Sequence, residues 1–305
     1  MSKIAFVFAG QGAQYPGMGQ NLCENFRSVK ELYDAADAHR PGTSGQSFSG
    51  TEAELKQTIN TQPCVFLADL AAALALEESG IHADLCAGFS LGELAALACS
   101  GVFTHTDAFA AVCERAKCME KASKEMDGEP AMAAVMKITA EEVEELCRGL
   151  DGIYPVNYNS PGQTAVSGTK AGLEAFCEKA KGVRVMPIPV SGAFHSPYMA
   201  QASAEFENTL KKITINTPSV PVYANLTGEP YPGDVVSCLA AQMKSPVRWQ
   251  TSIERMIADG ADIFIECGPG KTLAGLIRRI DKNVKVYSVQ DTDSLNAVLA
   301  ELRGE

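Results

Sequence analysis

The chain has 305 residues, 46% of them hydrophobic, and a formal net charge of −11 at pH 7. A chain of this length buries an ample core as one large domain or two smaller ones, and its acidic balance argues against nucleic acid as the main partner. Ten cysteines without a Cys-x-x-Cys pair, and only four histidines, predict neither a disulfide framework nor a bound metal.

The hydrophobic runs predict a protein that does not associate with a membrane. The opening run at 4–9 is too short for a signal peptide, and no run approaches the length of a membrane span. We therefore expect a cytoplasmic protein with reduced thiols. Six cysteines within apolar or helical patterns are expected to be core thiols: Cys86, Cys99, Cys113, Cys118, Cys147 and Cys177.

The run at 4–9 is typical of a buried parallel strand and ends in a glycine-rich turn, Gly-Gln-Gly-Ala-Gln at 10–14. The dinucleotide fingerprint fails there, because Tyr15 stands where its third glycine belongs. The turn could aim Gln11 over the sheet, or Gln11 could be an ordinary loop residue. Next we predict helix over 20–40, a loop over 40–50, a short helix over 51–60 with a capping box, and an apolar helix over 62–79.

An apolar run at 81–86, the sequence Gly-x-Ser-x-Gly at 88–92 and an alanine-rich run at 94–99 predict strand, sharp turn and helix with Ser90 at the apex. This is the pattern of a nucleophile elbow, in which Gly88 and Gly92 let strand and helix pass closely. The alternative is a chance match, because glycine and serine are common residues.

The predicted helix over 106–124 carries Arg115 on the same stripe as Ala108, Val112 and Met119. A charge on an apolar face needs a partner or a ligand, so Arg115 either pairs with a structural carboxylate or binds a substrate.

Residues 128–190 follow a different pattern, with strands near 131–138, 153–157, 163–168 and 183–190 and helices near 139–149 and 170–181. The order βαββαβ is ferredoxin-like. We therefore predict an α/β fold with a large α/β-hydrolase-like domain, residues 1–127 and 191–305, built on a parallel sheet and carrying the elbow. A small ferredoxin-like domain, residues 128–190, is inserted into it.

The large domain resumes with a predicted helix over 198–212, a strand over 220–224, a helix over 252–260 and a strand over 263–266. The following Gly-Lys-Thr is no phosphate loop, because Ile265 stands where that motif needs glycine.

A serine nucleophile needs a base, and the chain offers four histidines. His39 and His105 have the surroundings of surface residues, and His82 begins the strand at its wrong end. His195, at the junction between the insert and the large domain, is the best candidate.

Six ordered motifs resemble the malonyl-CoA:acyl carrier protein transacylases of type II fatty acid synthesis, and more broadly the acyltransferase domains of polyketide synthases. They cover nearly the whole chain: 10–14, 88–93, Arg115 placed 25 residues after Ser90, 192–196, 245–249 and 266–271.

The resemblance implies that Ser90 is malonylated by malonyl-CoA and passes the malonyl group to the phosphopantetheine thiol of acyl carrier protein in a ping-pong cycle. His195 is then the general base and acid, and the backbone carbonyl of Gln242 orients it. Gln11 and the backbone N–H of Leu91 form the oxyanion hole. No bound cofactor is implied, and a monomer is expected.

The resemblance also assigns substrate selectivity. Arg115 would pair with the malonyl carboxylate, which acetyl-CoA lacks, and Phe194 would crowd the α-methyl group of methylmalonyl substrates. The family usually has histidine before the nucleophile, where this chain has Phe89, so we expect altered polarity at the elbow with activity retained.

An acidic carrier protein needs a basic docking patch on this acidic chain. Two groups of cations are candidates, unless they are ordinary solvated faces: Lys117, Lys121 and Lys124 on one helix, and Lys271, Arg278, Arg279, Lys282 and Lys285 near the C-terminus. The alternatives to malonyl transfer are an acyl-carrier-protein acylhydrolase, a serine esterase, or a catalytically silent scaffold. The sequence leaves open whether the carrier serves fatty acid or polyketide synthesis.

Overall fold

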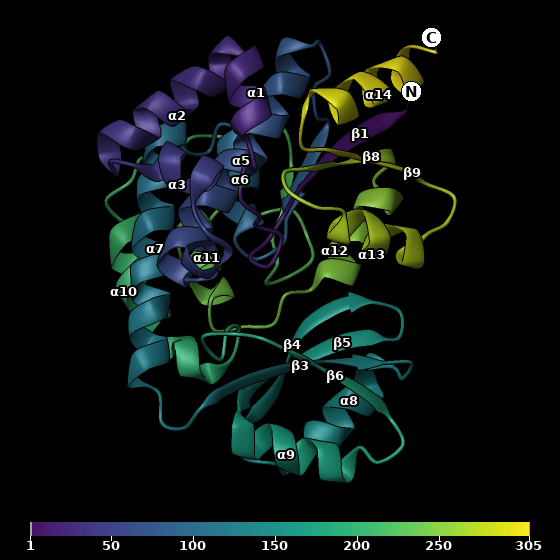
Figure 1. Ribbon diagram of the computed structural model, residues 1–305. Coiled ribbons are helices and arrows are strands. Elements are labelled where there is room, and N and C mark those ends of the chain that lie inside the picture. Colours follow the sequence, from purple (N-terminus) through teal and green to yellow (C-terminus); the bar gives the residue numbers. More distant parts are fainter. Residues whose placement is uncertain (1, 305) are drawn as a thin grey trace.

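The computed structural model describes residues 2–304. Its centre is a five-stranded sheet in the order β7-β2-β1-β8-β9, with every neighbouring pair parallel (Figure 1). The strands are β1 Lys3–Phe8, β2 Leu85–Gly88, β7 Val222–Tyr223, β8 Ala261–Cys267 and β9 Lys285–Val289. The predicted α/β fold with a parallel sheet core is confirmed.

Helices cover both faces of this sheet because successive side chains of a strand point to opposite sides. Phe6 and Phe8 lie in the larger core and Ala5 and Val7 in the smaller one. The larger core is covered by α1 Gln20–Asn25, α2 Arg27–His39, α3 Thr43–Ser49, α4 Glu52–Leu55, α5 Thr58–Glu78, α6 Gly92–Cys99, α7 His105–Glu125, α10 Ala200–Leu210, α11 Val235–Gln242 and α14 Thr292–Arg303. The smaller core is covered by α12 Trp249–Ala258 and α13 Thr272–Ile280.

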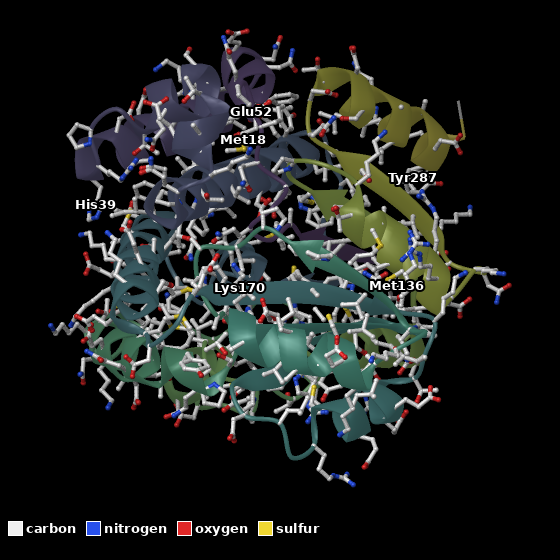
Figure 2. All side chains as sticks on the ribbon, turned by 60° about the horizontal axis from the view of Figure 1, so that its bottom comes forward. Met18, His39, Glu52, Met136, Lys170 and Tyr287 are labelled. Carbon is white, nitrogen blue, oxygen red and sulfur yellow. The ribbon has the colours of Figure 1, made fainter. Side chains whose placement is uncertain are left out.

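A second, antiparallel sheet has the order β4-β5-β3-β6. It consists of β3 Pro130–Met136, β4 Ile153–Ser160, β5 Gln163–Thr169 and β6 Arg184–Ile188, with α8 Ala140–Cys147 and α9 Lys170–Lys179 packed on one face. Figure 2 turns this part forward, with Met136 and Lys170 marking the end of β3 and the start of α9. The ferredoxin-like order is therefore present within 128–190, and the division into domains at these boundaries stays a prediction.

The second sheet is joined to the large domain by backbone hydrogen bonds. Val247 donates its N–H to the carbonyl of Val156 at 2.8 Å, and its carbonyl accepts the N–H of Tyr158 at 2.9 Å. Strand β4 is thereby fixed to the segment that follows α11.

Several sequence predictions need correction. The predicted loop at 40–50 contains α3, whose Thr43 and Ser47 are buried and pack the segment against the core. The predicted helix at 51–60 ends at Leu55, although the capping box of Thr51 and Glu54 forms. The strand before the elbow begins at Leu85, not residue 81, and the strand predicted at 220–224 covers only Val222–Tyr223.

Two predictions about buried segments also change. Helix α5 is long and apolar enough to cross a membrane by length and composition, contrary to the expectation, but 83% of its apolar window is buried inside the protein. All ten cysteines are free thiols, yet Cys177 is exposed and Cys99 only half-buried. Cys86, Cys113, Cys118 and Cys147 are buried as predicted.

Candidate active site

The turn between β2 and α6 is a nucleophile elbow by its geometry. Strands β1 and β2 are in register through Phe8 and Gly88, so the turns after them emerge at the same edge of the sheet. A Cβ on Gly88 would lie 1.9 Å from the backbone of Gly92, and one on Gly92 would lie 2.2 Å from the carbonyl oxygen of Phe8. Ser90 has φ of 55°, a strained conformation for a non-glycine residue. The close passage predicted at the two glycines is confirmed.

The hydroxyl of Ser90 lies within hydrogen-bond distance of His195. Ser90 Oγ and His195 Nε2 are 2.7 Å apart, and His195 Nδ1 lies 2.9 Å from the backbone carbonyl oxygen of Gln242. Since a carbonyl only accepts, Nδ1 carries the proton and Nε2 is free to accept one from Ser90. The structure thus brings together Ser90 from the β2–α6 turn, His195 from the junction after the insert, and Gln242 from the end of α11.

Burial keeps His195 neutral. Desolvation and, to a smaller extent, the charge of Arg115 lower the pKa of His195 to about 4, against the hydrogen bonds to the backbone of Gln242 and Ser245. Its φ of 60° is again left-handed, so both members of the Ser90–His195 pair occupy strained backbone positions. A neutral imidazole beside a serine hydroxyl is competent as a general base across the neutral pH range.

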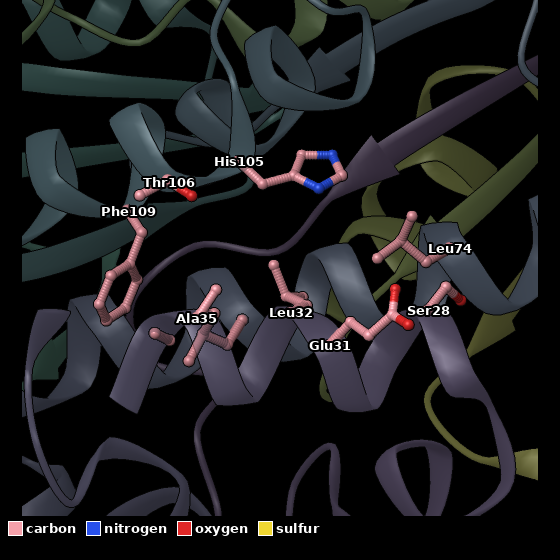
Figure 3. A pocket seen from close by; sticks show the side chains of 10 residues that line it. Ser28, Glu31, Leu32, Ala35, Leu74, His105, Thr106 and Phe109 are labelled. Carbon is pink, nitrogen blue, oxygen red and sulfur yellow. The ribbon is translucent and has the colours of Figure 1, made fainter. Parts of the chain in front are cut away.

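The other three histidines lie elsewhere. His39 and His82 are exposed, but His105 is half-buried and its pKa is lowered by desolvation, so its expected surface character was wrong. His105 lines a cavity of about 310 Å³ between α2, α5 and α7, with Leu32 and Phe109 (Figure 3). Neither Ser90 nor His195 lines this cavity.

Arg115 is buried in the site and directed at the serine. Its guanidinium donates from Nη1 to Gln62 Oε1 at 2.9 Å, and from Nη2 to Ser90 Oγ at 3.2 Å and Gln242 Oε1 at 3.0 Å. Its Nε has no acceptor among the described residues. Desolvation lowers the pKa of Arg115 to about 10, opposed by the charge of Glu93. Since no carboxylate forms a salt bridge with Arg115 within the described chain, an anionic ligand would find a cation there.

Three polar residues that sequence reasoning missed complete the site: Gln62, Glu93 and Asn225. Asn225 Oδ1 accepts the N–H of Ser90 at 2.7 Å, and its Nδ2 donates to the carbonyl of Gly88 at 2.7 Å. Asn225 follows strand β7, at the carboxyl edge where ligands of parallel sheets bind, which is the signal that could have found it. Gln62 is a polar residue inside an apolar helix, and such a residue needs a buried partner.

The two residues expected to form the oxyanion hole lie near the elbow. Gln11 belongs to the turn after β1, and a Cβ on neighbouring Gly10 would lie 2.7 Å from the carbonyl oxygen of Phe89. Its Nε2 donates to Thr58 Oγ1 at 3.2 Å, and it makes no hydrogen bond to Ser90 among residues 2–304. Leu91 is the N-cap of α6, and its N–H has no protein acceptor in the described chain.

Two aromatic residues flank the pair. Phe194, immediately before His195, is buried in the larger core. Phe89, immediately before Ser90, packs edge-on against Trp249 at 5.5 Å between ring centroids. An aromatic ring in place of a polar one therefore extends the smaller core up to the elbow.

The two predicted basic groups differ in their pairing. Lys117, Lys121 and Lys124 each lie within 2.6–3.1 Å of a glutamate oxygen. The second group, Lys271, Arg278, Arg279, Lys282 and Lys285, has no salt bridge to any described carboxylate. Gly270, before this group, lies against the Gln11 turn, since a Cβ on it would be 3.8 Å from that of Ala13. Arg278 and Arg279 instead donate hydrogen bonds to the carbonyl of Val286 and to Gln163. This group of cations without salt bridges begins beside the turn that carries Gln11.

The family model of the acyl transferase domain matches residues 5–296. Malonyl CoA-acyl carrier protein transacylase from Bacillus subtilis (strain 168) is 37% identical over 315 residues, covering 100% of this chain and 99% of the relative. The transacylase from Haemophilus influenzae is 36% identical over 309 residues, covering 98% of each chain.

Solved structures agree over the same length. The crystal structure of malonyl CoA-acyl carrier protein transacylase from Clostridium perfringens has a TM-score of 0.94 and 37% identity, covering 99% of this chain and 98% of that one. A malonyl-transacylase in complex with a type II polyketide synthase acyl-carrier protein has a TM-score of 0.91 and 32% identity, covering 100% of both chains.

Proposed function

The chain belongs to the acyl transferase domain family, and we propose that it transfers malonyl groups from malonyl-CoA to an acyl carrier protein through a malonyl-Ser90 intermediate. The observation that carries the proposal is the contact of Ser90 Oγ with both His195 Nε2 and the Arg115 guanidinium. The first contact serves acyl transfer, and the second offers a cation to the malonyl carboxylate.

In the first half-reaction, Ser90 Oγ attacks the thioester carbonyl carbon while its proton passes to His195 Nε2. The backbone carbonyl of Gln242, by accepting a hydrogen bond from Nδ1–H, stabilises the imidazolium that forms. The carbon–sulfur bond then breaks, and the sulfur of coenzyme A leaves with the proton that His195 returns. The product is a malonyl ester of Ser90.

In the second half-reaction, the phosphopantetheine thiol of the carrier gives its proton to His195 and attacks the ester carbonyl. The bond to Ser90 Oγ breaks and the oxygen recovers a proton from His195. We assign the oxyanion of both tetrahedral intermediates to the Leu91 N–H and, after it leaves Thr58, to the Gln11 amide.

Malonyl selectivity is assigned to Arg115 and Phe194. The orphaned Nε of Arg115 and one Nη can hold a carboxylate through two parallel bonds, with release of Ser90 Oγ to its role as nucleophile. An acetyl group leaves this buried cation without an anion. Loss of a charged hydrogen bond between substrate and enzyme commonly lowers kcat/KM by orders of magnitude. The Phe194 ring is proposed to crowd an α-methyl branch.

Carrier docking is assigned to the group of cations around α13. They have no salt bridges within the described chain, whereas the cations of α7 are each bound to a glutamate. An acidic carrier therefore gains more at α13, from which its arm can reach past the Gln11 turn toward Ser90.

The test is the intact mass of the protein after mixing with malonyl-CoA, alongside acetyl-CoA and a Ser90→Ala control. We expect one malonyl adduct, absent in the control, weak with acetyl-CoA and removed by carrier protein. Free coenzyme A without an adduct would indicate a hydrolase, and neither product would indicate a scaffold; both overturn the proposal.

A further inference from the structure

Glu93 is a fully buried carboxylate next to the elbow that the reaction described above does not use. It lies in the first turn of α6, where an acidic residue ordinarily serves the helix N-terminus. Its oxygens accept no hydrogen bond from α6. They accept from the hydroxyl of Tyr231, from Gln242 Nε2 at 2.9 Å and from the N–H of Asn225 at 3.2 Å.

Gln242 contacts the catalytic residues through its side-chain amide and its backbone carbonyl. Its Nε2 also donates to the carbonyl of Ser90 at 2.7 Å, its Oε1 accepts from Arg115, and its backbone carbonyl accepts from His195. Glu93 and the Ser90 carbonyl only accept, so the NH₂ of Gln242 faces them, and Arg115 only donates, so Oε1 faces it. Glu93 is thus one of three groups that hold this orientation, and the only one of them that is a carboxylate.

Asn225 carries a parallel constraint. Its backbone N–H is bound by Glu93, and its side chain accepts the N–H of Ser90 and donates to Gly88. Both amides that touch the elbow are thus tied to the same carboxylate.

We propose that Glu93 is a positioning residue of malonyl transfer: its carboxylate fixes the orientation of Gln242 and the place of Asn225, and through them Ser90, His195 and Arg115. This inference rests on the proposed function, since it concerns the rate of Ser90 acylation. Small displacements of reacting groups cost up to about 100-fold in rate.

The charge of Glu93 provides a readout that a purely structural role does not give. Desolvation raises the pKa of Glu93 to about 7, opposed by the hydrogen bonds and by Arg115. The titratable groups facing it are Tyr231, Arg115 and Cys238, and their pKa values lie well above 8.5. Between pH 5.5 and 8.5, Glu93 is therefore the group of this cluster that changes charge.

The experiment compares wild type with Glu93→Gln, which has the same shape and no charge. At pH 8.5 we expect kcat for malonyl transfer to fall roughly 10- to 100-fold, with the KM for malonyl-CoA within about threefold. Toward pH 5.5, kcat/KM of wild type should fall to the value of the variant, because wild-type Glu93 is then protonated and uncharged. Below that, both should lose activity together as His195 takes up a proton.

Glu266→Gln is the matched control. Glu266 is equally buried, and its oxygens accept the N–H groups of Leu273 and Ala274 without touching Ser90, His195 or Arg115. This variant should lose stability and keep the wild-type pH profile of kcat/KM.

A folded Glu93→Gln protein with wild-type kcat, or with the same deficit at both pH values, overturns the inference. If Glu93→Gln does not fold, Tyr231→Phe replaces it. Loss of that hydroxyl raises the pKa of Glu93 further. The increase of kcat/KM with pH, which follows deprotonation of Glu93, should therefore occur at higher pH than in wild type. A midpoint at the same pH as in wild type overturns the inference. Failure of wild-type protein to form a malonyl adduct would instead refute the proposed function.

Discussion

The two sides of Ser90 differ in how completely their polar groups are paired. On the nucleophile side, Ser90, His195 and the Gln242 amide already form hydrogen bonds within the protein. On the oxyanion side, Gln11 is bonded to Thr58, and the N–H of Leu91 has no acceptor within the described residues. Buried Asp69 lies beside Ala9, which precedes the Gln11 turn, and neither of its carboxyl oxygens accepts a hydrogen bond of ordinary geometry among residues 2–304.

This difference separates two tasks of the site. Groups that generate the nucleophile are held in place before substrate arrives, so they need no rearrangement at the moment of reaction. Groups that meet the developing oxyanion need free donors: the Leu91 N–H is one, and the Gln11 amide becomes one when its bond to Thr58 is released. We therefore expect a substitution on the nucleophile side to remove the chemistry, and one on the oxyanion side to slow it.

Substitution of the base should have the largest effect. His195→Ala is expected to lower kcat by about 10⁴-fold or more, because Ser90 then has no group that takes its proton. Single-turnover malonylation followed by intact mass measures this directly. His105→Ala, which removes a half-buried histidine outside the site, should retain activity; a comparable loss in both proteins would place the base elsewhere.

Removal of the oxyanion donor should have a smaller effect. Gln11→Ala is expected to lower kcat by about 10²- to 10³-fold with little change in the KM for malonyl-CoA, as found when one oxyanion-hole donor is lost. Gln14→Ala, in the same turn, should stay within about threefold of wild type. Equal effects of both substitutions would mean that the turn, not the Gln11 amide, matters.

The nucleophile side was also the easier one to predict from sequence. Ser90, Arg115 and His195 belong to local motifs or to an apolar helix stripe, and the elbow needs only the two glycines, whose Cβ atoms would clash with backbone. The antiparallel insert followed from alternating short strands and helices. These signals are local, and local patterns dictate local geometry.

What the sequence did not reveal depends on contacts between distant segments. Asn225 and Glu93 are 132 residues apart and gain a role only when β7 pairs with β2. Helices α11 and α13 went unpredicted, as did α3, because a short helix is stabilised by packing more than by its own residues. Gln11 could be named as an oxyanion donor only from the resemblance, since its hydrogen bond to Thr58 carries no sequence signal.

The pH dependence of stability tests whether the buried carboxyl of Asp69, near the oxyanion side, is uncharged. Desolvation and the charge of Glu266 raise the pKa of Asp69 well above its usual range. A carboxyl with a raised folded-state pKa contributes stability that is fully present below its unfolded pKa and is lost as pH rises through the folded value. Asp69→Asn should therefore gain about 1–3 kcal/mol over wild type near pH 8 and much less near pH 4.

Urea unfolding of the two proteins at both pH values measures this difference. Asp34→Asn, at an exposed site on α2, is the control and should change stability by less than about 0.5 kcal/mol. An Asp69→Asn protein less stable than wild type at pH 8 would mean that the Asp69 carboxylate is charged in the folded protein and stabilised by its surroundings.

The smallest effect concerns carrier docking, which belongs to neither side. Arg278→Glu combined with Arg279→Glu should raise the KM for acyl carrier protein by about 3- to 10-fold, since exposed charge pairs contribute around 1 kcal/mol or less. The KM for malonyl-CoA and the malonyl-adduct rate should not change, and added salt should reduce the difference between variant and wild type. Lys121→Glu with Lys124→Glu is the matched control on α7, where both lysines are already bound to glutamates. A larger effect of the α7 substitutions would indicate that the carrier docks at α7. An unchanged KM for the carrier in both variants would indicate that neither group of cations binds it and that the contacts lie at the active-site entrance.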